Sequence, residues 1–206
     1  SGLEAASGIA GTGMDFGSGD YANGGYSMGD QARTLEAWVW HDSVPGSVQR
    51  YLTLPDETSC IRHDANGTLK FFWKNEWGID GITASSQLAT GRWFHVAGTW
   101  VSGAGNARLY CNGIQVSSGG AYGTLETGSS FTMASGGEPM DGVLDEMRVS
   151  TAARSSNWIW ATWYSIASNA AFCTYHPAQG LDLIQIPVGA GGGVTNAYKI
   201  SRYEIT

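Results

Sequence analysis

The chain has 206 residues, of which 30 are glycine and 9 are tryptophan, and 42% are hydrophobic. This composition excludes intrinsic disorder and supplies enough apolar residues for a large core. The formal net charge of −7 argues against sequence-independent binding of nucleic acid. No apolar run is long enough to predict a membrane-spanning helix.

Alternation of apolar and polar residues predicts strands along most of the chain. In the segment 34–40, Leu35, Ala37 and Val39 share one face and Glu36 lies on the other. Aromatic and β-branched residues on both faces indicate a strand that is packed on two sides. Further strands are predicted at 69–73, 93–101 and 142–150.

The clearest hairpin joins residues 107–111 to residues 114–116 through Asn112 and Gly113. An Asn-Gly pair favours the type I′ turn, because both central residues of that turn need a positive φ. Regularly spaced strands separated by Gly, Ser, Asn and Asp indicate a two-sheet sandwich or jelly roll.

A single helix is predicted, over residues 155–164. A Ser or Asn cap precedes it, and Trp160, Trp163 and Tyr164 fall at i, i+3 and i+4. These residues form one aromatic face that suits the closed end of a sandwich.

Residues 9–165 resemble the laminin-G-like, concanavalin A-like jelly-roll domain of secreted bacterial multidomain proteins. The resemblance implies an all-β, two-sheet antiparallel jelly-roll sandwich over residues 1–165, with one short helix and an extracellular or cell-surface location. The motifs that carry it lie at 13–21, 34–39, 91–100, 109–113, 142–149 and 153–155.

The C-terminal extension, residues 166–206, is predicted to form strands. Residues 181–189 and 194–206 resemble the opening strands of a formylglycine-generating, sulfatase-modifying type of domain. So few residues cannot bury a core of their own. They are expected either to pack on their own chain or begin a truncated domain, or to mediate self-association by strand exchange through residues 178–206.

Aspartates are the candidate metal ligands. Asp145 is predicted to share a strand face with Val143, Met147 and Val149, where a carboxylate needs a partner. That partner is either a backbone N–H or arginine, or a Ca²⁺ ion of the kind that related jelly rolls hold near the sheet rim. Calcium prefers several oxygen ligands, and the matching motifs place these additional candidates near it: Asp15, Asp20 and Asp141.

Aromatic side chains are the candidate sugar contacts. Trp73 and Trp77 flank a polar turn that contains Asn75, and Tyr122 lies in a Gly-rich loop. The alternative for Trp73 and Trp77 is packing in the core or at its rim. Core positions are expected for the other tryptophans considered, namely Trp38, Trp93, Trp100, Trp158 and Trp160.

Three cysteines, Cys60, Cys111 and Cys173, lie far apart in the sequence and without a CxxC motif. This spacing argues against a zinc site. One disulfide with a spare thiol and three buried thiols both remain open.

The leading functional prediction is a non-catalytic, lectin-like module that binds a glycan or a surface protein. The alternative is a structural subunit of an extracellular assembly or filament, linked by the C-terminal strands. A glycan-cleaving enzyme ranks third, because Asp145 and Glu146 face opposite ways on a regular strand and do not form the closely spaced carboxylate pair of a glycosidase.

Overall fold

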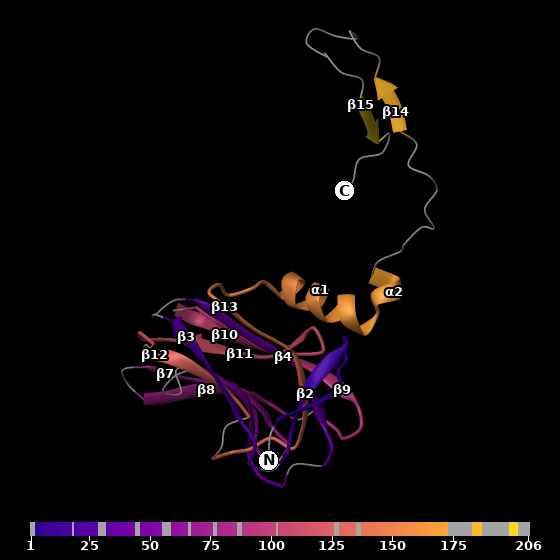
Figure 1. Cartoon of the computed structure of the whole chain (residues 1–206). Coiled ribbons are helices and arrows are strands. Elements are labelled where there is room, and N and C mark those ends of the chain that lie inside the picture. Colours follow the sequence, from indigo (N-terminus) through magenta and orange to yellow (C-terminus); the bar gives the residue numbers. More distant parts are fainter. Residues whose placement is uncertain are drawn as a thin grey trace. The chain divides into compact units, whose positions relative to one another are not determined.

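The computed structural model describes residues 3–17, 19–28, 32–43, 46–54, 59–65, 67–75, 78–85, 88–101, 103–125, 128–134, 137–172, 183–186 and 198–201. The chain divides into two compact units, Ser1–Ser168 and Asn169–Thr206, whereas the sequence placed the boundary at residue 165. The first unit is built almost entirely of antiparallel strands, with one helix (Figure 1).

Seven strands form the first sheet. Their spatial order is β1 (Glu4–Ser7), β2 (Thr12–Phe16), β13 (Gly142–Ser150), β4 (Arg33–His41), β9 (Trp93–Trp100), β10 (Gly103–Cys111) and β11 (Ile114–Ala121).

Six strands form the second sheet. Their order is β3 (Ala22–Met28), β12 (Gly128–Met133), β5 (Gln49–Thr53), β6 (Cys60–His63), β7 (Leu69–Asn75) and β8 (Gly78–Ala84). The two antiparallel sheets confirm the predicted all-β sandwich.

The core lies between the sheets. Leu35 and Val39 of β4 pack in one buried cluster with Phe71 and Trp73 of β7. At Gly98 of β9, a Cβ atom would lie 2.5 Å from the Phe71 ring, so the two sheets approach closely where this residue has no side chain. The period-two pattern of the sequence therefore does separate the core face of β4 from its outer face.

The predicted hairpin is present as β10 and β11. Asn112 and Gly113 have φ values of 49° and 76°, as a type I′ turn requires. The Asn112 side chain also accepts a hydrogen bond from the backbone N–H of His95 at 3.0 Å, which ties the turn to β9.

Helix α1 (Ser156–Ala167) is capped at its N-terminus by Ser155, whose side chain accepts a hydrogen bond from the backbone N–H of Trp158. Ile159 is fully buried in a small cluster with Ala97 and Tyr110. Because Ala97 and Tyr110 alternate with core residues along β9 and β10, α1 covers part of the outer face of the seven-stranded sheet. No helix within the described residues is long and apolar enough to cross a membrane.

The second unit contains α2 (Asn169–Phe172) and two antiparallel strands, β14 (Leu183–Ile186) and β15 (Tyr198–Ser201). The tail therefore forms strands, as the sequence predicts. Its similarity to a formylglycine-generating domain stays a prediction.

Candidate functional site

The outer face of the seven-stranded sheet has a buried part and an open part. In the buried part, beside the cluster that α1 covers, Trp38 and His95 are 3% and 1% exposed and their rings lie 5.3 Å apart. His95 Nε2 lies 3.5 Å from a carboxylate oxygen of Glu36, which is also buried. These groups are closed to a ligand because they are buried.

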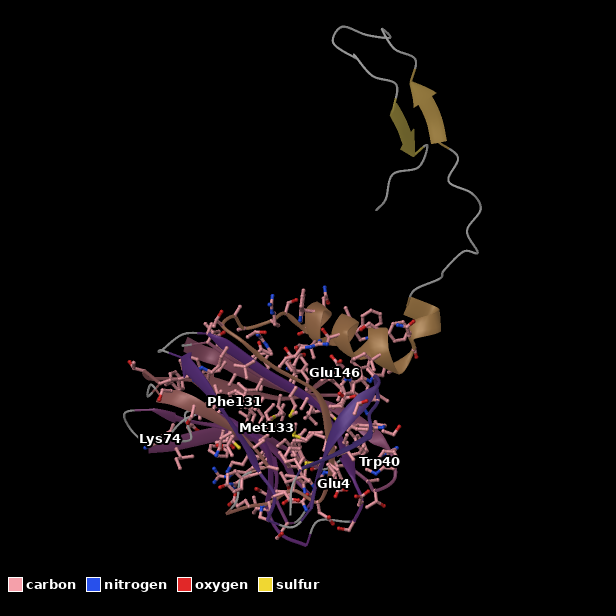
Figure 2. All side chains as sticks on the ribbon, viewed as in Figure 1. Glu4, Trp40, Lys74, Phe131, Met133 and Glu146 are labelled. Atoms are coloured by element: carbon pink, nitrogen blue, oxygen red, sulfur yellow. The ribbon has the colours of Figure 1, made fainter. Side chains whose placement is uncertain are left out.

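The open part of this face follows a row of five residues, one from each of five neighbouring strands; four are half-buried or exposed, and Val143 in the middle is buried. Register pairs Trp93 with Trp40, Trp40 with Val143, Val143 with Asp15, and Asp15 with Glu4. Directly opposed residues in antiparallel strands share a face, so the five side chains form a continuous line. We call this line the acidic tryptophan row; Trp40 and Glu4 are labelled on the same side of the sandwich in Figure 2.

Two indoles form one end of the row. The rings of Trp40 and Trp93 lie 5.8 Å apart at an interplanar angle of 56°, and both side chains are only half-buried. The Trp40 indole N–H donates to Asp42 Oδ1 at 3.0 Å. This hydrogen bond holds the orientation of the indole ring and places a carboxylate beside it.

Carboxylates form the other end of the row. Partial burial is the main cause that raises the pKa of Asp15 above its ordinary value, and nearby Asp42, Glu4 and Asp141 raise it further. Asp141 Oδ2 accepts a hydrogen bond from the Ser43 hydroxyl at 2.8 Å. The row therefore combines aromatic faces with several hydrogen-bond acceptors.

The predicted aromatic contacts are largely elsewhere. Trp73 is fully buried and packs 5.7 Å from Phe71, which corrects its prediction as a ligand contact, because a core indole has no free face. Trp77 lies outside the described residues. Asn75 ends β7, and only its backbone is described. Tyr122 is 52% exposed and follows β11, an edge strand that does not belong to the row.

The predicted metal ligands are divided between different structural roles. Asp145 Oδ2 accepts the N–H of Ala10 at 3.0 Å, so it binds backbone as one of the two alternatives proposed. Asp20 Oδ2 accepts the N–H of Gly17 at 3.1 Å. Of the four predicted ligands, Asp15 belongs to the row, and Asp141 lies close enough to raise the pKa of Asp15. Across the residues that the structure describes, no group of three or more His, Cys, Asp or Glu side chains could hold a metal ion.

Asp145 shares the outer face with Val143, as predicted, but its predicted sharing of a face with Met147 and Val149 is wrong, because β13 contains a bulge. The pairing register shifts between Asp145 and Arg148, and Glu146 has a φ of 50°. Met147 and Val149 consequently pack against the core, whereas Asp145 lies opposite Trp38 on the outer face.

The aromatic residues of α1 also differ from expectation. Trp158 and Trp160 are 48% and 46% exposed, so their predicted core positions are wrong. Trp160 stacks on Tyr164 at 4.8 Å, and the Arg154 guanidinium lies 4.3 Å from the Trp158 ring. Sequence reasoning missed both indoles of the row: Trp40 is not among the predicted site residues, although alternation with Val39 puts it on the outer face, and Trp93, a predicted core residue, is half-buried.

Solved structures share this fold at low sequence identity. A heptameric SAP-like pentraxin from Limulus polyphemus is 13% identical, with a TM-score of 0.61 over 77% of this chain and 84% of its own. Domain 4 of AbnA, an extracellular GH43 arabinanase of Geobacillus stearothermophilus solved with arabinotriose, is 19% identical, with a TM-score of 0.60 and coverages of 78% and 80%. A botulinum neurotoxin type C structure is 13% identical, with a TM-score of 0.62 over 80% of this chain and 45% of its own.

These likenesses establish the fold alone. None of the curated proteins compared with the chain matches its sequence. Residues 16–160, however, match the laminin G-like family that is described as the concanavalin A-like lectin/glucanases superfamily. The chain belongs to this concanavalin A-like family, as its motifs predict.

Proposed function

We propose that the chain is a non-catalytic, secreted or cell-surface module that binds a glycan through the acidic tryptophan row. The observation that carries this proposal is the half-buried pair of Trp40 and Trp93 beside carboxylates on the open part of a lectin-like sandwich. An indole face packs against the C–H face of a pyranose, and a carboxylate accepts hydrogen bonds from its hydroxyl groups. The row offers both kinds of contact along one line.

The neighbouring folds support this class of ligand. The arabinanase domain was solved with arabinotriose, and cell entry of the type C neurotoxin is described as dependent on two ganglioside molecules. A protein ligand is the alternative partner, because the binding domain of neurotoxin DC was solved with rat synaptotagmin II.

A glycan array with purified protein tests the proposal. We expect Trp40→Ala and Trp93→Ala to abolish binding to the glycans that the wild type retains. Trp158→Ala and Trp160→Ala are matched controls, because they remove exposed indoles from α1 and should leave binding unchanged. Binding that depends on the α1 indoles, or an array without any bound glycan, would contradict the proposal.

Two additions to this assay test the predicted calcium ion and the enzyme alternative. Repeating the array with EDTA tests the predicted Ca²⁺, because a calcium-dependent site would lose its ligand. Release of reducing ends from a bound glycan would favour the enzyme alternative.

A structural subunit that self-associates through residues 178–206 is the second candidate. One observation favours it: β14 and β15 form an antiparallel two-stranded sheet, in which register pairs Ile184 with Ile200 and Ile186 with Tyr198. A two-stranded hairpin is marginally stable by itself and gains stability by pairing. Light scattering should then show assemblies for residues 1–206 and monomers after deletion of residues 178–206; an unchanged oligomeric state would remove this candidate.

A further inference from the structure

The charge of the acidic tryptophan row restricts what it can bind. Glu4 and Asp15 belong to the row, Asp42 accepts the Trp40 indole N–H, and Asp141 lies close enough to raise the Asp15 pKa. Among the residues that the structure describes, the charged groups that shift the pKa of Asp15, namely Asp42, Glu4 and Asp141, are all acids. The aromatic pair therefore lies at the edge of a negative electrostatic field.

Two arginines on strands of the row or next to it have other contacts. The Arg92 guanidinium, which precedes Trp93, lies 4.5 Å from the ring of Phe94, a residue of the core face. Arg148 on β13 pairs with Glu146. Neither of these contacts brings a positive charge to the part of the row between Trp40 and Asp15.

We propose that the row selects sugars that carry a protonated amine over neutral sugars, and that it rejects glycans that carry carboxylates or sulfates. This inference rests on the proposed function and names its ligand class. An ammonium group beside Trp40 and Trp93 gains both the attraction of the indole π face and the attraction of the neighbouring carboxylates. A uronate at the same place would meet like charges.

Isothermal titration with tetrasaccharides of equal length tests this selectivity: a glucosamine tetramer, its fully N-acetylated form and tetragalacturonate. The pH is chosen so that the sugar amines are protonated and the protein carboxyls ionised. We expect the amine form to bind about tenfold more tightly than the N-acetylated form, and tetragalacturonate to show no binding.

Charge-neutral variants separate this inference from the proposed function. Asp42→Asn, and independently Asp15→Asn, should bring the ratio of the two affinities close to one, whereas Asp80→Asn, an exposed aspartate of β8, should leave it unchanged. Equal affinity of the wild type for the amine and N-acetylated forms, with binding that still needs Trp93, would overturn the selectivity and leave the proposed function intact. Preference for tetragalacturonate would also overturn it. If Trp40→Ala and Trp93→Ala leave all binding unchanged, the proposed function itself fails, and this inference with it.

Discussion

Trp40 and Trp93 are directly opposed residues of β4 and β9, and their ring centroids lie 5.8 Å apart on the outer face of the seven-stranded sheet. Trp38, two residues before Trp40 in β4, occupies the same face but is only 3% exposed. The same face of one strand therefore carries a structural tryptophan and a half-exposed one. Trp38 lies between the buried residues His95 and Asp145 on the neighbouring strands, whereas one neighbour of Trp40 is the half-buried Trp93.

This difference predicts unequal stability costs. Trp38→Ala removes a buried indole and should lower the free energy of unfolding by about 3–5 kcal/mol. Trp93→Ala should lower it by about 1–2 kcal/mol, because its side chain is only half-buried in the folded state. Urea denaturation of both variants measures this; a loss for Trp93→Ala as large as that for Trp38→Ala would show that the pair is structural.

Asp145 is predicted to stabilise the start of the sheet. Its Oδ2 accepts the N–H of Ala10 in the turn between β1 and β2, and a Cβ atom at Gly8 would lie 2.3 Å from that oxygen. Asp145→Ala should cost about 1–3 kcal/mol, because it leaves a part-buried N–H without its acceptor. Asp20→Ala, which removes an acceptor from Gly17, is the control and should cost less at its more open position. Hydrogen exchange at Ala10 should speed up only in the Asp145 variant.

A calcium ion bound at Asp145 would make the melting temperature sensitive to EDTA. If the carboxylate binds backbone alone, EDTA should leave the melting temperature of the wild type unchanged. If calcium contributes, EDTA should lower the melting temperature of the wild type and should have little effect on Asp145→Ala.

Acid should destabilise the sandwich through two buried histidines. Burial, with a further contribution from nearby His63, lowers the pKa of His41 from 6.5 to about 4, and burial also lowers the pKa of His63. The unfolded chain then binds more protons than the folded chain between these values. Stability is therefore present above pH 6.5 and is lost as the pH falls toward 4, by roughly 3 kcal/mol for His41.

Urea unfolding at a series of pH values from 7 to 4 measures this effect. His41→Gln should flatten the pH dependence, even though it also removes the contact of His41 with the Tyr51 hydroxyl at 2.9 Å. Asp15, whose pKa is raised, acts in the opposite sense but is more exposed. Stability that is independent of pH in the wild type would contradict the burial of neutral His41.

The described cysteines should be unreactive. Cys60 and Cys111 are free and buried, and burial raises their pKa values to about 12 and about 11. Thiolate is the reactive form, so both should resist a disulfide reagent until the chain unfolds. Cys173 lies outside the described residues, and Cys173→Ser removes its contribution. Thiol titration of this variant should detect no thiol in buffer and two in denaturant; reaction in buffer would mean that one of them is accessible.

The strands that sequence reasoning predicted are those with strong alternation of large residues. β4, β9 and the β10–β11 hairpin belong to this group, because burial on alternate positions leaves a clear pattern. β3, β8 and β12 were missed because glycine, serine and asparagine replace large residues in them. Their pairing depends on backbone hydrogen bonds with neighbouring strands, which the local sequence does not record.

The candidate site was harder to predict than the fold. A period of two tells which face of a strand a residue occupies, but it does not tell where α1 lies on that face. Trp73, a predicted ligand contact, is buried in the core between the two sheets, whereas Trp160 of α1, a predicted core residue, is exposed. The row itself depends on the register of five strands far apart in sequence, of which residues 4 and 143 are the most distant.

The indole N–H signals of a ¹⁵N-labelled sample, titrated with a glycan that the array retains, test the central claim most directly. The signals of Trp40 and Trp93, assigned from Trp40→Phe and Trp93→Phe, should shift on saturation with one common affinity. The Trp40 signal should respond strongly, because its N–H donates to Asp42 at 3.0 Å. The signals of Trp158 and Trp160 should not move. Shifts confined to the α1 indoles, with Trp40 and Trp93 unchanged, would contradict glycan binding at the acidic tryptophan row.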